Sequence, residues 1–455
     1  MPPVLAFFAA FAVIAGLSGC TSYQAALLPQ HANLAPGLAN LDRTIPESGP
    51  RDPPRTIDIA RPLSADQIGL LAILNDPDLK SERGVLGAAR AGLLQATLLP
   101  NPSANLGYGA LISGPGTASS IAASLAQDIA AIVTRGARIK SAQARREQVD
   151  ADQLWREWQV AQKARQLAVD IDAENRTIHL TRREHRLLLR EVAEVRAAIA
   201  EGNLTASALA PLLTAIAAAE HSLRNLSLAH LSNWQALDGL LGLVPSARFA
   251  IARPVFGPLP AGLETLVTDL PQRRPDLAAL RLGYRSAEAD VRAAILGQFP
   301  AFAVGGSYSS DTTNVVSAGP TLTFALPVFD RNQGNVAKSR ATRQLLREQY
   351  QARLDSAVAS IQALIAQLRR LSGDLIQARA AASGAASLAV TARRAYAQGN
   401  LDQRTLIDYE TTALDRAVDV AGIERRIGED RIVLAVELGL DLPRVRIALS
   451  SARHR

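Results

Sequence analysis

The residue with the most distinctive chemistry in this sequence is its single cysteine, Cys20. It follows an uncharged apolar stretch from Val4 to Gly19, whose length suits the core of a secretory signal better than a membrane span. The segment Leu17-Ser18-Gly19-Cys20 fits the bacterial lipobox, in which the thiol receives a diacylglycerol and the new N-terminal amine an acyl chain. We therefore expect a signal peptide over residues 1–19 and a lipidated Cys20. The alternative is a weak transmembrane anchor with a chance buried cysteine.

The sequence around Cys20 also indicates a destination. Thr21 follows the cysteine, and a lipoprotein without Asp at this place is normally sent to the bacterial outer membrane. No Lys or Arg precedes Arg43, although a signal normally opens with a basic segment. Either the terminal amine alone supplies that charge, or the start of the sequence has been misplaced.

No pattern for catalysis, a cofactor or nucleic-acid binding is present. The sequence lacks a GxSxG, HExxH or phosphate-cradling glycine loop, and His179 and His185 lie in a charged helical stretch that favours solvated side chains. One Cys and six scattered His leave little material for a metal centre. The net charge of +7 comes from Arg and Lys interleaved with 42 acidic residues, without a basic cluster containing aromatics. We therefore expect neither an enzyme, nor a metal or cofactor site, nor a nucleic-acid partner.

The chain contains an internal duplication. Pro77-Asp78-Leu79 recurs as Pro275-Asp276-Leu277 at an offset of 198, and four further matches follow in the same order at offsets of 197 to 200. These are Pro100 with Pro300, Gly136 with Gly334, Gly202-Asn203-Leu204 with Gly399-Asn400-Leu401, and Leu241-Gly242-Leu243 with Leu438-Gly439-Leu440. Five ordered matches at nearly one spacing indicate two repeats of one structural unit.

Each repeat predicts the same order of elements, a mainly α-helical fold with a small β part. A helix that ends before proline is followed by two β-like stretches, a very long helix without Pro, and a return helix that starts at Gly-Asn-Leu. The expected ranges are helices 78–99 and 276–299, β-stretches 104–112, 117–126, 301–309 and 315–326, and long helices 137–201 and 335–398.

The long helices must pack against other long helices. Leu354, Val358, Ile361, Ile365, Leu368 and Leu375 form an alternating apolar seam, as do Leu188, Val192, Val195 and Ile199, and this spacing is typical of coiled coils. The four β-stretches alternate apolar with small polar residues, which suits a barrel with lipid outside and water inside. Four strands cannot close a barrel without open edges, so several copies would have to share one.

The motifs together resemble those of the TolC family of outer-membrane efflux ducts. Arg273-Arg274-Pro275-Asp276-Leu277 is similar to the family's RRPDL segment, and Leu326-Pro327-Val328-Phe329-Asp330 with Gly334 to its strand-to-helix segment. Tyr396-Ala397-Gln398-Gly399 is similar to its hairpin turn, and the resemblance covers about residues 60–443. It implies a homotrimer with a twelve-stranded barrel in the outer membrane and a long periplasmic α-helical barrel. It also implies a periplasmic adaptor and an inner-membrane pump, often of the resistance-nodulation-division type.

The resemblance assigns roles to two parts of the helical hairpins. Gly202, Asn203 and Leu204, with Gly399, Asn400 and Leu401, would be the adaptor-docking tips; the alternative is turns and nothing more. In the family, carboxylates six and nine residues after the hairpin glycine line the closed end of the tunnel. Here those positions are Thr405 and Asp408, so we expect one acidic ring, with Arg404 as a candidate counter-charge. The alternative is a solvated carboxylate on an outer helix face.

These assignments divide the sequence into six parts. They are a signal peptide (1–19), a lipidated N-terminal segment (20–75), a first repeat (76–245), a connector (246–273), a second repeat (274–443) and a C-terminal tail (444–455). The predicted function is a passive outer-membrane duct with a periplasmic gate, in contact with outer-membrane lipid. The alternative is a coiled-coil structural lipoprotein of the envelope without a channel.

Overall fold

The structure is a computed structural model that describes residues 23, 25–45, 55–300 and 302–440. Cys20, the expected signal peptide and the expected tail 444–455 lie outside the described residues. The chain divides into two compact units, residues 1–34 and 35–455. The described part of the first unit contains no helix or strand, so every element named below belongs to the second unit.

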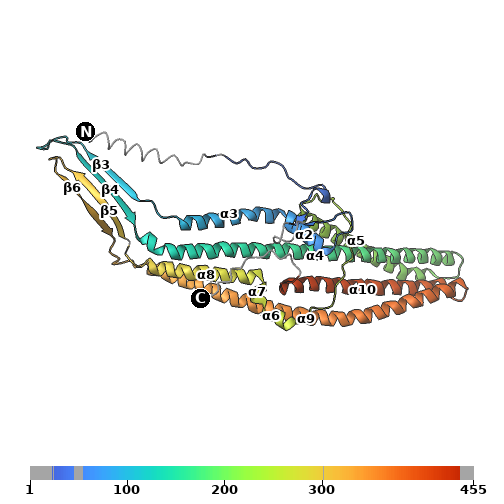
Figure 1. The fold of residues 1–455 in the computed structure, drawn as a ribbon. Helices are drawn as coiled ribbons and strands as arrows, with labels where there is room; N and C mark the ends of the chain where they lie inside the picture. The colour runs from blue at the N-terminus through green and yellow to red at the C-terminus, as the bar shows by residue number, and fades with distance from the viewer. Residues whose placement is uncertain (1–22, 24, 46–54, 301, 441–455) are drawn as a thin grey trace. The chain divides into compact units, whose positions relative to one another are not determined.

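The two repeats have the predicted order of helices and strands (Figure 1). Helices α3 and α8 come first, the long helices α4 and α9 follow the strands, and α5 and α10 return. The bounds are α3 Pro77–Thr97, α4 Ala130–Ala200, α5 Leu209–Leu241, α8 Pro275–Leu296, α9 Gln333–Ala397 and α10 Gln403–Glu437. Helix α3 begins where expected because Pro77 occupies the first turn and Asp76 accepts the Leu79 N–H at 2.8 Å.

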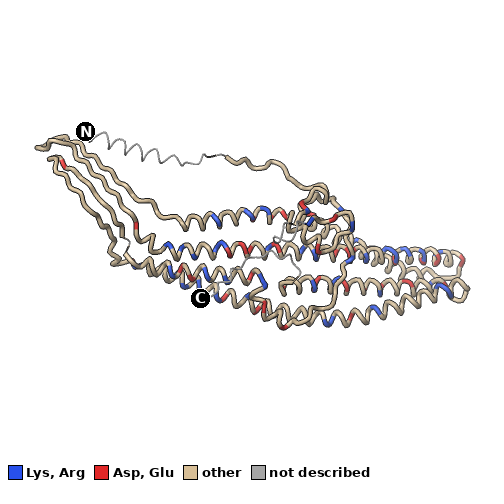
Figure 2. Tube along the Cα trace, viewed as in Figure 1, with Lys and Arg blue, Asp and Glu red and all other residues tan. Residues whose placement is uncertain are grey.

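The strands of both repeats form one antiparallel sheet in the order β3-β4-β5-β6. The strands are β3 Ser103–Gly109, β4 Ser120–Asp128, β5 Phe302–Ser310 and β6 Val316–Phe324. β4 pairs with β5, with Ile121 opposite Ser310, so the sheet joins the two halves of the chain. Apart from Asp128 at the end of β4, these strands carry no charge (Figure 2). Within the described chain, the outer edges of β3 and β6 have no partner strand.

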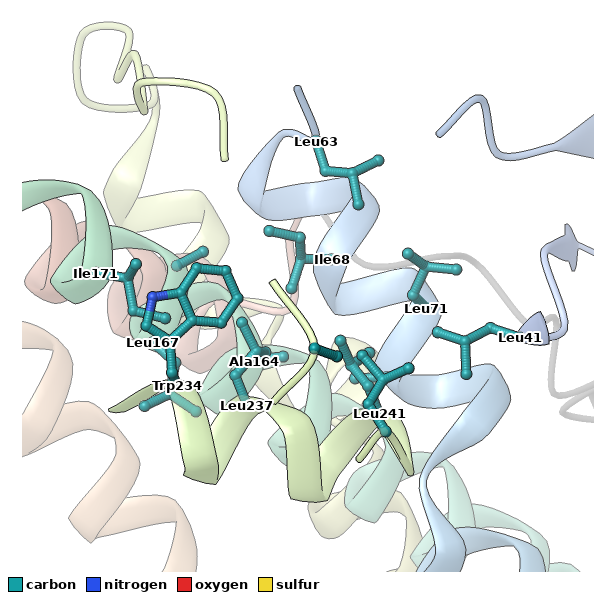
Figure 3. Packing of buried hydrophobic residues seen from close by; sticks show 14 of the residues in the cluster. Leu41, Leu63, Ile68, Leu71, Ala164, Leu167, Ile171, Trp234, Leu237 and Leu241 are labelled. Carbon is teal, nitrogen blue, oxygen red and sulfur yellow. The ribbon is translucent and has the colours of Figure 1, made fainter. Parts of the chain in front are cut away.

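The main hydrophobic core lies where residues 35–45 and 55–75 pack against α4 and α5 (Figure 3). Helix α2, Ala65–Asn75, which the sequence analysis did not predict, begins at a capping box between Ser64 and Gln67. Its Ile68 and Leu71 pack in one cluster with Leu167 of α4 and Leu237 of α5. The expected lipidated N-terminal segment, 20–75, therefore contributes to the core.

The predicted apolar seams are packing surfaces. Ile361 and Leu368 of α9 are buried in a second cluster with Ile427 and Leu434 of α10, and the other four residues of that seam pack against it. Leu188, Val192 and Val195 of α4 are buried as well. The alternation of four- and three-residue steps keeps one side of each long helix facing its neighbours.

The return helix α5 is apolar but mostly uncovered. Residues 206–241 form the one helix in the described residues that is long and apolar enough to cross a membrane by length and composition, which is weak support for a span. Only 6% of its most apolar window is buried. Leu213, Leu228 and Leu231 are exposed on it.

The described part of the unit also contains six short elements. They are η1 Leu38–Asn40, β1 Thr44–Ile45, β2 Arg55–Thr56, η2 Ala206–Ala208, α6 Leu263–Thr268 and α7 Leu270–Arg273. α6 and α7 lie in the stretch expected to be only a connector.

Candidate channel gate and docking tips

Both helical hairpins end in the same backbone turn, at the end of the unit away from the sheet (Figure 1). Gly202 and Gly399 have φ values of 79° and 75°, in the left-handed region that glycine adopts without strain. The following Asn203 and Asn400 N–H groups donate to the carbonyls of Ala198 and Ala395 at 2.8 and 2.9 Å. This pattern closes a helix C-terminus by satisfying its last carbonyls. The predicted Gly-Asn-Leu turns are therefore present in both repeats.

The two tips differ in how the next helix starts. Asp402 caps α10, because its Oδ1 accepts the Thr405 N–H at 2.9 Å and its Oδ2 accepts the Thr405 hydroxyl at 2.7 Å. No equivalent cap precedes α5, where Thr205 instead hydrogen-bonds Ser207. Leu204 is exposed and Leu401 half-buried, so both leucines reach the surface of the tips.

The three residues predicted to form the gate lie together on the first turns of α10. Asp408 and Arg404 are exposed, and Thr405 is half-buried with its hydroxyl engaged by Asp402. Within the described residues no carboxylate pairs with Arg404, and no cation pairs with Asp408. Beside them, Glu410 pairs with Arg393 of α9, which ties that carboxylate to the hairpin.

A further carboxylate, which the sequence analysis missed, lies close to Asp408. Glu191 of α4 is only 3% exposed, and burial raises its pKa, with the charge of Asp408 adding to the rise and that of Arg404 opposing it. Its position four residues after the buried Leu187 places it on the inner side of α4, and this spacing was the available signal. The candidate gate therefore has two acidic residues per chain, one from each helix.

The arrangement repeats one heptad farther from the tips. Glu184 of α4 and Asp415 of α10 each lie seven residues from Glu191 and Asp408, and burial raises both pKa values. Repulsion by Asp415 adds to the shift in the pKa of Glu184. Between the two acid pairs, Leu187 packs with Ile407 and Leu414 in an apolar cluster. The α4–α10 interface near the tips thus alternates apolar and acidic layers.

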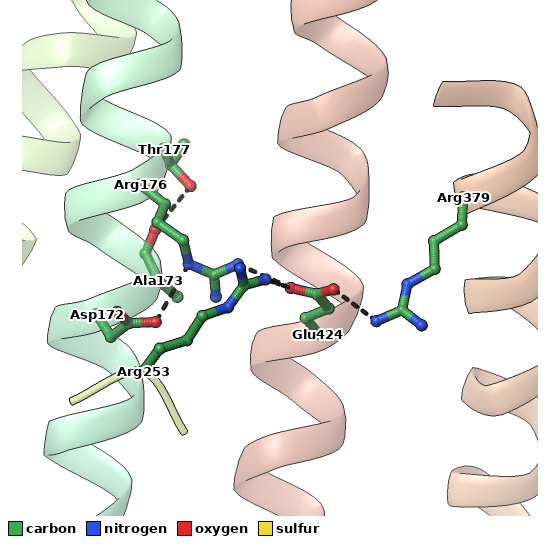
Figure 4. A network of polar contacts seen from close by, with 7 residues as sticks. All are labelled: Asp172, Ala173, Arg176, Thr177, Arg253, Arg379 and Glu424. Carbon is green, nitrogen blue, oxygen red and sulfur yellow. Dashed lines mark hydrogen bonds and ion pairs between the residues drawn. The ribbon is translucent and has the colours of Figure 1, made fainter. Parts of the chain in front are cut away.

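Nearer the middle of the helices, Glu424 of α10 binds three arginines (Figure 4). Its carboxylate accepts from Arg176 of α4 at 2.7 Å, Arg253 of the connector at 3.0 Å and Arg379 of α9 at 2.8 Å. Burial alone would raise the pKa of Glu424, but the hydrogen bonds from Arg379 and Arg176 outweigh it and hold the pKa below its ordinary value. One carboxylate therefore holds four parts of the chain together.

Farther along α10, Glu429 has the opposite environment. Burial, a hydrogen bond with Asp170 of α4 and the charge of Asp170 raise the pKa of Glu429 to about 7, although Arg425 opposes the rise. Arg425 Nη1 lies 2.8 Å from Glu429 Oε1 and 3.2 Å from Asp170 Oδ1. A single guanidinium is shared between two carboxylates, and its charge does not offset the rise in the pKa of Glu429.

The segment Arg273 to Leu277 has a structural role. Arg274 is 1% exposed, pairs with Asp276 at 2.8 Å and with Glu437 at the end of α10, and stacks over Trp155 of α4 at 4.9 Å. Arg353 of α9 also donates to Asp276, at 2.6 Å. The motif fastens the start of α8 to the three helices around it.

The two histidines of α4 differ from each other. His179 is exposed, as expected for a solvated face. His185 is half-buried, with Nε2 3.5 Å from Glu220 of α5. Within the described residues no group of three His, Cys, Asp or Glu is placed to hold a metal ion.

Comparisons with known proteins agree with this architecture. A family model described as outer membrane efflux protein matches residues 266–439. No curated protein matches the chain. A membrane protein from Pseudomonas aeruginosa has the same fold, with a TM-score of 0.69 and 18% identity over 94% of this chain and 100% of that one.

Two further solved structures share the fold. The outer membrane protein VceC from Vibrio cholerae has a TM-score of 0.66 and 16% identity, over 82% of this chain and 96% of that one. The CmeC outer membrane channel from Campylobacter jejuni has a TM-score of 0.66 and 13% identity, over 82% and 85%. The match of residues 266–439 to the family model and the shared fold confirm the resemblance seen in the motifs.

Proposed function

We propose that this protein is the outer-membrane channel of a tripartite efflux system, a passive duct with a periplasmic gate and no enzymatic activity. The observation that carries the proposal is the sheet. Four antiparallel, almost uncharged strands from both repeats lie side by side with two unpaired outer edges in the described chain, and each strand pair continues into a long helix. Lipid does not tolerate an unpaired edge, so other copies must supply the missing partners. Three copies of four strands give a barrel of twelve.

The side chains of the sheet support a membrane location. Leu106, Leu125, Val304, Leu322 and Phe324 are exposed apolar residues on the four strands. Exposing such an apolar surface to water is energetically unfavourable, whereas in a membrane barrel it would face acyl chains. The uncovered apolar face of α5 fits the same assembly, because a neighbouring copy would cover it.

The two hairpin tips support a proposal about the partners. We propose that the tips at residues 202–204 and 399–401 dock a periplasmic adaptor, which joins the duct to an inner-membrane pump of the resistance-nodulation-division type. Lipidated Cys20 would anchor the N-terminus in the outer membrane beside the barrel. The exported compound would be selected by the pump, since one Met and one lipidated Cys leave few soft metal ligands in the duct.

The competing function is a coiled-coil envelope lipoprotein without a channel. It accounts for the seams of α4 and α9 but gives no role to an uncharged sheet with two open edges. A duct should form trimers that dissociate on heating, and it should conduct ions in planar bilayers. A monomeric protein without conductance would leave only the structural lipoprotein.

Two neighbouring residues of β6 sharpen this test. Leu322 is exposed and apolar, and Thr321 projects to the opposite face of the strand. In a barrel, Leu322→Lys places a charge in lipid at a cost of about 2–4 kcal/mol and should prevent insertion. Thr321→Lys, the matched control, should insert and shift ion selectivity toward anions. Equal insertion of both variants would contradict the barrel.

A further inference from the structure

We propose that basic and apolar residues at the junction between the sheet and the long helices form a binding surface for anionic phospholipid headgroups of the periplasmic leaflet. We call this surface the junction collar. Its basic residues are Arg138, Lys140, Arg331, Lys338 and Arg340. The inference rests on the proposed function in one respect, that the sheet enters the outer membrane.

The stretches that contain the collar have the same number of basic residues in both repeats. Residues 130–146, at the start of α4, contain five basic and no acidic residues, and residues 331–347, at the start of α9, also contain five and none. Lys140 and Lys338 occupy equivalent positions, 198 residues apart, although the sequence has only four lysines. Elsewhere the two long helices mix both signs (Figure 2). Each repeat thus has a cluster of positive charge near the strands. Two such clusters indicate an anionic partner at that level of the molecule.

The basic groups of the collar are available to a ligand. Arg138, Lys140, Arg331, Lys338 and Arg340 are exposed, and within the described residues none pairs with a carboxylate. The nearest acids, Asp128 and Asp330, accept the backbone N–H groups of residues 131 and 332 at 3.4 and 2.8 Å.

Two basic residues farther along the helices are paired within the chain. Arg343 lies 2.9 Å from Glu288, and Arg146 lies 3.2 Å from Asp150. The five basic residues of the collar, in contrast, lie in two stretches, 130–146 and 331–347, that contain no acidic residue.

An apolar band lies directly beside the basic groups. Phe329 is 92% exposed and Phe299 65%, and Leu98, Leu326 and Val328 are exposed as well. Phe299 and Phe329 line a cavity of about 700 Å³ together with Arg138 and Arg331. Aromatic rings next to guanidinium groups match the boundary between acyl chains and phosphates, where both kinds of side chain are stabilised.

The distances fit a membrane surface. At 1.5 Å per residue, Arg138 and Lys140 lie about 12 and 15 Å along α4 from its start, and Lys338 lies about 8 Å along α9. A headgroup layer is roughly 5–8 Å thick, and the field of its charges extends about 8 Å farther at physiological salt. Basic side chains at this depth each add about fivefold to the affinity for an anionic surface.

The test compares phosphatidylglycerol with phosphatidylcholine as ligands of the purified full-length protein in detergent, with retained lipids counted by native mass spectrometry. The test variant carries Arg138→Gln, Lys140→Gln, Arg331→Gln and Lys338→Gln. The matched control removes the same charge far from the sheet, from exposed residues near the tips or the middle of the helices: Arg182→Gln, Arg196→Gln, Arg369→Gln and Arg394→Gln. A third variant, Arg138→Lys with Arg331→Lys and Arg340→Lys, keeps the charge.

We expect the wild type to prefer phosphatidylglycerol, and the preference to weaken as salt is added. In the test variant, the preference for phosphatidylglycerol over phosphatidylcholine should fall at least about tenfold. The control and the charge-keeping variant should retain it. No preference in the wild type, or full preference in the test variant, would overturn the inference. The inference would also be overturned if the test variant kept its lipid preference but its channel lost anion selectivity. The basic groups would then line the tunnel. Conductance of the same samples tests the proposed function separately, because lipid preference is read without it.

Discussion

Arg176 Nη1 on α4 lies 2.7 Å from Glu424 Oε2 on α10, which ties the long helix of the first repeat to the return helix of the second. The same carboxylate also binds Arg379 of α9 and Arg253 of the connector. The side chain of Glu424 is only 16% exposed, so water can replace few of these hydrogen bonds when they break. Any movement of α10 relative to α4 and α9 must break or rearrange these bonds.

Glu424→Gln should destabilise the helical part by about 1–3 kcal/mol, because three arginines lose the charge they share. The folded-state pKa of Glu424 is lowered, so its contribution is complete above the unfolded value and is lost as the pH falls through the folded value. Thermal unfolding followed by circular dichroism should show a lower midpoint at pH 7 and convergence of variant and wild type in strong acid. Asp419→Asn, an exposed position on the same helix, is the control. A midpoint equal to that of the control would show that the network contributes nothing.

Glu429 should give the opposite pH dependence. Its pKa is raised to about 7, so the folded state binds more protons than the unfolded state between about pH 4.5 and 7, and its effect on stability becomes less favourable as the pH rises through that window. Glu429→Gln should remove this slope and stabilise the protein at pH 8 by the order of 1 kcal/mol, after allowance for solvent screening. Unfolding midpoints measured from pH 4 to 8 provide the check, and a slope unchanged by the substitution would contradict the raised pKa of Glu429.

Much of this fold could be predicted because its elements are long and duplicated. The helix ends at Gly202 and Gly399, the apolar seam through Ile361 and Leu368, and the four strands each appear in the sequence as local patterns. The pairing of β4 with β5 could not be read locally, because it joins residues nearly 200 positions apart. Glu424 was missed for the same reason, since its importance comes from the helices that pack beside it. Helix α2 was missed because it is short and its apolar residues face several elements at once.

The hairpin tips should contact the adaptor. Cysteines introduced at Leu204 or Leu401 should crosslink to it in the assembled pump, since both residues reach the surface of the tips. Ser113→Cys, in the loop between β3 and β4, is the control at the opposite end of the unit. Crosslinking from Ser113→Cys alone would show that the orientation is reversed.

Lipidation is tested at Cys20, which lies outside the described residues. Cys20→Ser should abolish labelling with radioactive palmitate, because the thiol that would carry the diacylglycerol is gone. Export should fall only in part, since the barrel itself would hold the trimer in the membrane and the acyl chains would add anchoring to it. A Cys20→Ser protein that still takes up palmitate would rule out this site.

Asp408→Ala tests the gate. In a trimer, three Asp408 carboxylates around one axis would repel each other and attract cations. Their removal should raise conductance in planar bilayers, lower cation selectivity and abolish any block by trivalent cations, because the acidic ligands are lost. Thr405→Ala should have little effect, since its hydroxyl is already held by Asp402.

Glu194→Ala is the matched control for Asp408→Ala, because Glu194 is an exposed carboxylate three residues after Glu191 on α4. It should leave conductance and cation block unchanged if only Asp408 lines the constriction. Arg404→Gln should act in the opposite direction to Asp408→Ala on cation selectivity, because it removes the one positive charge of this turn of α10. Should Asp408→Ala conduct, select and respond to trivalent cations as the wild type does, Asp408 would be a solvated residue on the outer face of α10, and the gate would have to be sought at Glu191 and the acidic layer of Glu184 and Asp415.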